Sequence, residues 1–238
     1  MTDTSRMKAI LVATATIAFV ASPWASGQFG GFDPDRFPVP QVDPPIQPAG
    51  YAFSIWGLIY LWLLVHASYG LFQRAEDPDW DAPRWPLFVS LAVGAAWIPV
   101  AQASPVWAMI LILVMLGGVL GALFVAPKQQ PLLCTAPLSI YAGWLTAASF
   151  VSIAVNAAGY GIWFGAMGWA WIAVVVLFAL GTVLQLRLGS MPGFGLAIAW
   201  ALIGVAVQNG AQTPGFAAVA MLGAIGFIGL AWLVTKLP

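Results

Sequence analysis

The chain has 238 residues, of which 61% are hydrophobic and 7% are charged, whereas an average soluble domain carries roughly 25% charged residues. So few charges cannot solvate a globule of this size, and the formal net charge is zero. This composition excludes a soluble enzyme, a nucleic-acid-binding protein and a disordered chain. It predicts an all-α, polytopic helical membrane protein.

Uncharged windows along the chain predict about eight transmembrane helices. Each window is long enough to cross a hydrocarbon core of ~30 Å at 1.5 Å per residue. In chain order, the expected spans are residues 7–24, 51–72, 86–103, 106–126, 135–157, 165–186, 193–208 and 216–235.

The first span has two interpretations. Arg6 and Lys8 precede a short apolar run, and Ala-Ser-Gly at residues 25–27 resembles the cleavage site of a secretory signal peptide. The run also extends through Trp24, which suits the interfacial anchor of a retained helix. Retention is favoured, and cleavage would leave seven helices without inverting the others.

The loop charges predict the orientation. If the N-terminus is cytoplasmic and all eight spans cross, the outer loops carry one basic residue, Arg36, and every other basic residue lies inside. This is the bias of the positive-inside rule. The inside residues are Arg6, Lys8, Arg74, Arg84, Lys128, Arg187 and Lys236. The expectation is a bacterial inner (cytoplasmic) membrane with both termini cytoplasmic.

Two extramembrane segments have unusual compositions. Residues 23–50 hold seven prolines and three acids, so this outer loop is expected to run in extended or polyproline-like turns, long enough to fold back as a lid. The inner segment 76–81 is acidic and is flanked by Arg74 and Arg84. Its simplest interpretation is a solvated connection whose bases bind lipid headgroups.

The start of the second span carries a family resemblance. Pro48, Gly50, Phe53, Trp56 and Tyr60 follow one another there. Their order is similar to the signature of the TspO/translocator-protein family, the tryptophan-rich sensory proteins.

Two further motifs extend the resemblance. Trp97 and Pro99 resemble the family's Trp-x-Pro in its third helix, and Tyr141 with Trp144 resembles the Pro-Tyr-x-x-Trp region of its fifth. The family usually has Asn eight residues after the fifth-helix Trp, where this chain has Ser152. The nearest Asn is Asn156, one turn further on.

The resemblance covers residues 1–158 and implies a TspO-like five-helix region that includes the loop 23–50. Residues 159–238 would add three transmembrane helices. It implies a sensor or carrier that binds hydrophobic ligands, porphyrin or another tetrapyrrole or a sterol-like molecule, with lipid as the other partner and no required cofactor. The implied ligand-binding residues are Pro48, Gly50, Tyr51, Phe53, Trp56, Tyr60, Trp97, Pro99, Tyr141 and Trp144.

The same residues can be interpreted without the family. At 100° per residue, Phe53, Trp56 and Tyr60 fall within about 60° of one another. Such an aromatic stripe suits a flat ligand, although lipid-facing or helix-packing bulk is the plainer alternative. Trp97 beside the helix-kinking Pro99 would widen a cavity, or would be an ordinary interfacial tryptophan.

No arrangement of side chains predicts catalysis or metal binding. The sequence offers no nucleophile–base pair, carboxylate dyad or phosphate loop. His66 has no second ligand in its span, so it is expected to be a packing histidine. Light-dependent porphyrin degradation and a structural role in a membrane complex stay as alternatives. Small residues at Gly117/Gly121 and Gly118/Ala122 predict close helix packing, within the chain or in a homodimer.

Overall fold

The computed structural model describes residues 2–27 and 29–236, and every regular element in these ranges is helical. Eight helical segments are long and apolar enough to cross a membrane, so the predicted all-α polytopic fold is confirmed. The long helices are α1 (Thr2–Ser26), α2 (Ile55–Phe72), α4 (Arg84–Ala103), α5 (Pro105–Val125), α6 (Thr135–Gly159), α7 (Ala166–Leu188), α8 (Pro192–Asn209) and α9 (Pro214–Val234). The short elements are α3 (Pro78–Asp81) and the 3-10 turns η1 (Pro34–Arg36) and η2 (Gly50–Ser54).

Proline marks several helix starts. α5, α8 and α9 each begin with proline, which is tolerated in the first turn because the N–H groups there have no partner within the helix. Ser104 alone separates α4 from α5, and its hydroxyl accepts a hydrogen bond from the backbone N–H of Trp107 at 3.4 Å. In contrast, Pro23 lies inside α1, so the proline-rich loop begins at residue 27 and not at residue 23.

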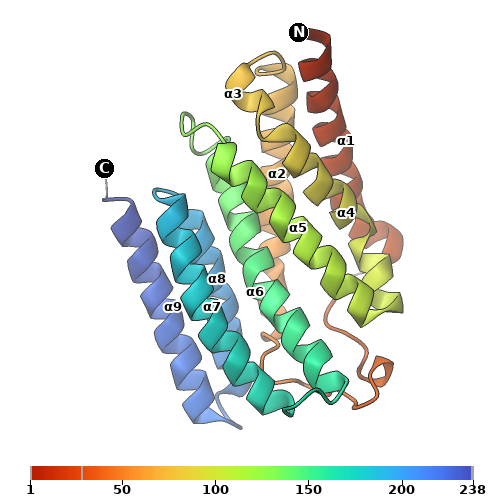
Figure 1. The fold of residues 1–238 in the computed structure, drawn as a ribbon, viewed down its shortest axis with the longest axis vertical. Helices are drawn as coiled ribbons and strands as arrows, with labels where there is room; N and C mark the ends of the chain where they lie inside the picture. The colour runs from red at the N-terminus through yellow and green to blue at the C-terminus, as the bar shows by residue number, and fades with distance from the viewer. Residues whose placement is uncertain (1, 28, 237–238) are drawn as a thin grey trace.

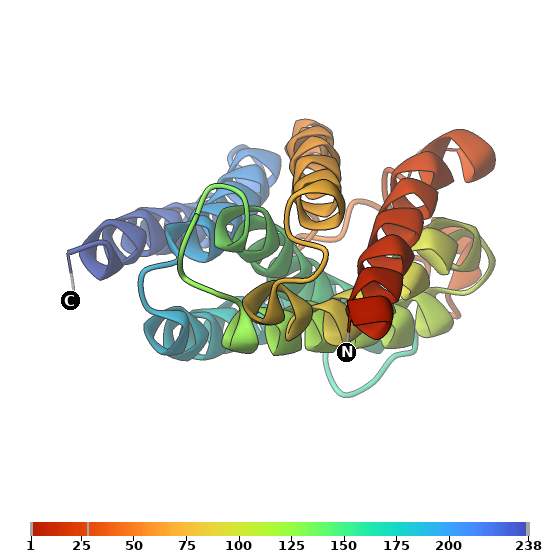
Figure 2. The same cartoon turned by 90° about the horizontal axis from the view of Figure 1, so that it is seen from above.

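The long helices lie side by side (Figure 1), with both termini toward one end of the bundle and residues 29–49 at the other. We call these the termini end and the loop end. α6 is the most buried of the spans and contacts α2, α5, α7 and α8, while α1 and α9 lie at opposite sides (Figure 2). α7 and α8 therefore pack directly on α6, across the predicted boundary at residue 158, and α9 packs on α7 and α8.

Glycines allow α6 and α8 to approach closely. A Cβ atom on Gly143 would collide with the carbonyl oxygen of Phe194, and one on Gly193 would collide with the hydroxyl of Ser139. α7 joins the same contact, because the side-chain oxygen of Gln185 accepts a hydrogen bond from the backbone N–H of Gly195 at 2.7 Å. Small residues at such crossings let helix backbones pack tightly in lipid.

The loop formed by residues 29–49, which we call the lid, folds back over the loop end of the bundle. The backbone N–H of Val39 donates to the carbonyl oxygen of Gly159 at 2.9 Å, and the amide of Asn209 donates to that of Pro45 at 2.7 Å. Phe37 and Ile46 are buried against the helices. The loop thus takes the lid position expected for a long segment that cannot become a transmembrane helix.

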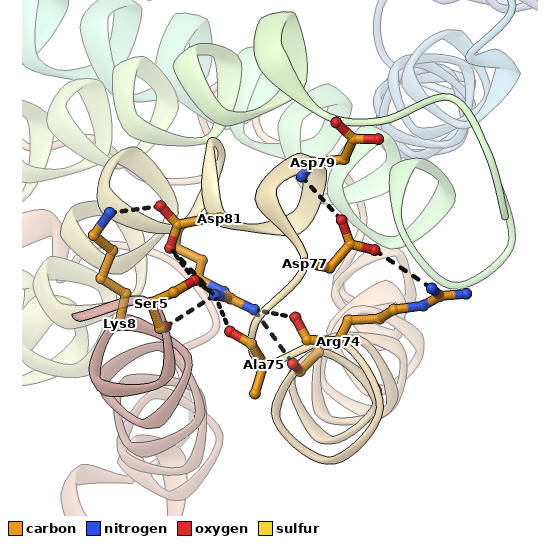
Figure 3. A network of polar contacts seen from close by, with 9 residues as sticks. Ser5, Lys8, Arg74, Ala75, Asp77, Asp79 and Asp81 are labelled. Carbon is orange, nitrogen blue, oxygen red and sulfur yellow. Dashed lines mark hydrogen bonds and ion pairs between the residues drawn. The ribbon is translucent and has the colours of Figure 1, made fainter. Parts of the chain in front are cut away.

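A polar cluster ties α1 to the α2–α4 connection at the termini end (Figure 3). We call Ser5, Lys8, Asp81 and Arg84 the polar clasp. The Asp81 carboxylate accepts from Ser5 Oγ at 2.7 Å, Lys8 Nζ at 2.6 Å and Arg84 at 3.2 Å. The guanidinium of Arg84 also donates to the carbonyl oxygens of Ser5, Arg74 and Ala75.

The clasp corrects the expected role of Arg84. This side chain does not reach toward headgroups, because Asp81 and several carbonyl oxygens satisfy its N–H groups inside the fold, where the residue is 4% exposed. Next to it, Trp80 is buried and stacks on His66 with ring centroids 5.2 Å apart. Nδ1 of His66 lies 2.9 Å from the carbonyl oxygen of Leu133, so the prediction of a packing histidine is confirmed.

Candidate functional site

A cavity of about 550 Å³ lies under the lid, and helices α1, α2, α4, α5, α6, α7 and α8 contribute to its wall. This volume falls within the range of roughly 300–1,000 Å³ that is typical of small-molecule sites. Within the described part of the chain, no charged side chain lines it. The aromatic lining residues are Phe19, Trp24, Phe29, Phe32, Phe53, Trp56, Tyr60, Trp97, Trp144 and Phe150.

The aromatic stripe that runs from η2 into α2 faces the cavity. Phe53, Trp56 and Tyr60 all line it, and the rings of Trp56 and Tyr60 stack with centroids 5.3 Å apart and planes 25° apart. Phe19 of α1 meets both rings edge-on, at 5.8 and 5.2 Å. These contacts fix the two larger rings against each other, and the three residues share one face, as their spacing predicts.

Trp97 of α4 is a cavity residue and not an interfacial one. It is 8% exposed, and its indole N–H donates to the carbonyl oxygen of Ala108 at 2.9 Å. Phe29 from the lid packs edge-on against it with centroids 4.7 Å apart. The lid therefore closes on the cavity through an aromatic contact.

Trp144 of α6 shares the cavity with the stripe. Its ring centroid lies 5.9 Å from that of Phe53 and 6.2 Å from that of Trp56. Sequence position alone would put Trp144 nearer the other end of the membrane. Trp144 and the stripe meet because the lid runs inward before α2 begins. The backbone N–H of Ala49 there donates to the carbonyl oxygen of Gly204, within α8, at 3.0 Å.

Three predicted site residues lie away from the cavity lining, whereas the other seven form part of it. Tyr51 is 45% exposed and packs edge-on against Trp200 at 5.6 Å, because it projects from η2 on the side of α8. Pro99 lies on an exposed face of α4. Tyr141 is fully buried behind Trp56, with its hydroxyl 3.1 Å from that of Ser90.

Sequence reasoning expected the loop to cover the site, but it did not single out several of the wall residues. The lid supplies Phe29 and Phe32, and α8 supplies Ala201, Leu202 and Val205. The lid phenylalanines had a usable signal, since large aromatic side chains in a loop are costly to leave in water. The α8 residues had none, because one apolar face of a membrane helix looks like any other.

The position where the family usually has Asn also faces the cavity. Ser152 is part of the lining, whereas Asn156 is not. The Asn156 amide donates to the carbonyl oxygens of Ser152 at 2.8 Å and Pro105 at 3.3 Å, which joins α6 to the start of α5. Asn156 therefore does not replace the missing Asn in the cavity.

The cavity reaches the surface between α1 and α2. Among the described lining residues, the exposed ones are Trp24 at the end of α1, then Gly50, Ser54 and Gly57 in η2 and the first turn of α2. A Cβ atom on Gly57 would meet nothing within 4 Å. These residues lie within the spans Thr4–Ser26 and Gly50–Phe72, close to the loop end of the bundle.

The described residues offer little for bond-making chemistry. No group of three or more His, Cys, Asp or Glu side chains that could hold a metal ion occurs in the described part of the chain. Cys134 is fully buried outside the cavity, and burial raises the pKa of its thiol to about 12. A thiol with such a pKa stays protonated and is a poor nucleophile.

The comparisons with known proteins agree with this geometry. The family model described as "TSPO-like protein" matches residues 9–234, which include all the cavity-lining helices. No curated protein and no solved structure matches the chain significantly. With its aromatic cavity enclosed by membrane-spanning helices, the chain is an integral membrane protein and belongs to the TSPO-like protein family.

Proposed function

We propose that the protein binds a hydrophobic ligand in the aromatic cavity, a porphyrin or other tetrapyrrole or a sterol-like molecule, and acts as its membrane sensor or carrier. The observation that carries this proposal is the wall of stacked and edge-on rings from α1, α2, α4, α6 and the lid. Flat aromatic surfaces give a large contact area and lose little rotamer freedom on binding. Membership of the TSPO-like family supports the same assignment.

The proposal is tested by titrating the purified protein with protoporphyrin IX and following the porphyrin absorption band. We expect saturable binding that weakens about tenfold in Trp56→Ala and further in Phe53→Ala/Trp56→Ala, because each change removes aromatic contact area. Trp232→Ala is the matched control, since Trp232 is 65% exposed on α9 and does not line the cavity.

Two results would contradict the proposal. Absence of saturable protoporphyrin IX binding would contradict the proposed function. Saturable binding with the same affinity in the double variant and in the wild-type protein would place the ligand outside the cavity.

A further inference from the structure

We propose that the connection between α6 and α7, residues 160–165, inserts into the lipid headgroup region at the loop end of the bundle and anchors the two helices there. The proposal does not depend on the proposed function, because the cavity lining includes none of these six residues, all of which the structure describes. Three observations support it: the exposure of large apolar side chains, the backbone conformation of Trp163, and the lengths of the two helices.

The connection exposes an unusual set of side chains, which we call the apolar tip: Tyr160, Ile162, Trp163 and Phe164. The indole of Trp163 is the most exposed of them, at 85%. Residues 160–165 contain no charged side chain, and the α8–α9 connection at the same end reads Gly-Ala-Gln-Thr, without a large apolar residue. Large apolar side chains in bulk water forgo the free energy that burial gives, so the tip is suited to an apolar partner.

The backbone holds the tip in a defined but costly conformation. Trp163 has φ of 53°, in the left-handed region that bulky residues rarely adopt. The carbonyl oxygen of Ile162 accepts hydrogen bonds from the backbone N–H of Phe164 and the indole N–H of Trp169, both at 2.6 Å. The ring of Trp163 stacks on that of Trp169 with planes 14° apart. Contact with an apolar partner would offset both the strain and the exposure of the indole.

The helix lengths identify lipid as the partner. α6 has 25 residues and α7 has 23, which at 1.5 Å per residue gives about 37 and 34 Å. Both exceed a hydrocarbon core of ~30 Å by a few ångströms, so the short connection between them lies among the headgroups, where Trp and Tyr rings are favoured. Trp24, near the end of α1, and Trp107, near the start of α5, are exposed at the same end. Their origin from separate helices is typical of an aromatic belt and not of one protein-binding patch.

A spin label on Phe164→Cys tests the insertion in lipid nanodiscs. The native Cys134 is fully buried, so the label attaches to the introduced cysteine. Gln212→Cys is the matched control, because Gln212 is exposed in the α8–α9 connection at the same end. We expect the label at 164 to collide mainly with oxygen, which concentrates in lipid, and the label at 212 mainly with a water-soluble nickel chelate. Equal access of the chelate to both labels would overturn the proposal. Shielding of the label at 164 from both reagents would also overturn it, because protein would then cover the tip.

Trp163→Asn, combined with the label at 164, tests the anchor itself. Asparagine tolerates the left-handed conformation but has no ring, so we expect access of the nickel chelate to the label to rise about threefold as the tip leaves the headgroup region. Trp85→Asn is the control, since Trp85 is exposed at the start of α4, at the termini end. Unchanged access in Trp163→Asn, or an equal rise in Trp85→Asn, would overturn the role of the indole.

Discussion

Two adjacent glycines of α5 meet different surroundings. A Cβ atom on Gly118 would lie 2.7 Å from the carbonyl oxygen of Pro86 and 2.9 Å from Cβ of Ser90, whereas one on Gly117 would meet nothing within 4 Å. Gly118 thus packs against α4 within the chain, and Gly117 does not.

This difference gives a prediction with an internal control. We expect Gly118→Ala to lower the free energy of unfolding by about 1–3 kcal/mol through overpacking. Gly117→Ala should be neutral or stabilise by up to about 1 kcal/mol through helix propensity. Thermal unfolding in detergent, followed by size-exclusion chromatography, measures both. Equal effects of the two substitutions would show that α4 and α5 do not pack in this way.

At the same scale, the sequence predicted the aromatic stripe but not its neighbours. Phe53, Trp56 and Tyr60 could be grouped because helical spacing alone puts them on one face. The positions of Tyr51 and Trp144 depend on where α2 starts relative to α8, which is a tertiary property.

Among the elements, α1 is joined to the rest of the bundle at both ends. At one end, Phe19 packs into the cavity wall. At the other end, Ser5 and Lys8 contact Asp81 in the polar clasp. These contacts support the interpretation of α1 as a retained helix. Its apolar run alone also fitted a signal peptide, because a cleaved segment and a helix can share the same composition.

The clasp provides the element-scale prediction. Asp81→Asn removes the negative charge that accepts hydrogen bonds from three donors. We expect this variant to lower the free energy of unfolding by about 2 kcal/mol, because the buried charge of Arg84 then has no carboxylate partner. Asp79→Asn is the control: Asp79 is exposed, and its backbone N–H, not its carboxylate, bonds to Asp77. Chemical unfolding in detergent compares the two. A destabilisation as large in Asp79→Asn as in Asp81→Asn would contradict the role of the clasp.

The positions of the spans in the sequence could be predicted closely, but which helices pack against one another could not. In lipid, the outside of a helix is as apolar as its buried side, so hydrophobic periodicity does not tell inside from outside. The contact of α8 with α6, and the contribution of α8 to the cavity, follow instead from Gly143, Gly193 and Gly204, where side chains would prevent the approach.

Across the whole molecule, the basic residues gather at one end. Arg36 lies in the lid, and the other seven lie at the termini end of the described chain or in the connections there. The positive-inside rule therefore predicts that the termini end faces the cytoplasm.

Single cysteines test this orientation. Asp35 in the lid and Asp79 at the termini end are both exposed, whereas the native Cys134 is buried. In intact bacterial cells, a membrane-impermeant maleimide should label Asp35→Cys at once and Asp79→Cys only after lysis. The reverse labelling pattern would show that the termini end faces away from the cytoplasm.

The position of the cavity opening also determines which ligand concentration matters. Because the exposed lining residues between α1 and α2 belong to membrane-spanning segments, we expect a ligand that enters there to come from the pool dissolved in the bilayer. Occupancy would then follow the mole fraction of ligand in the lipid. At constant total ligand, adding empty membrane would reduce binding by dilution, even though the volume of water had not changed.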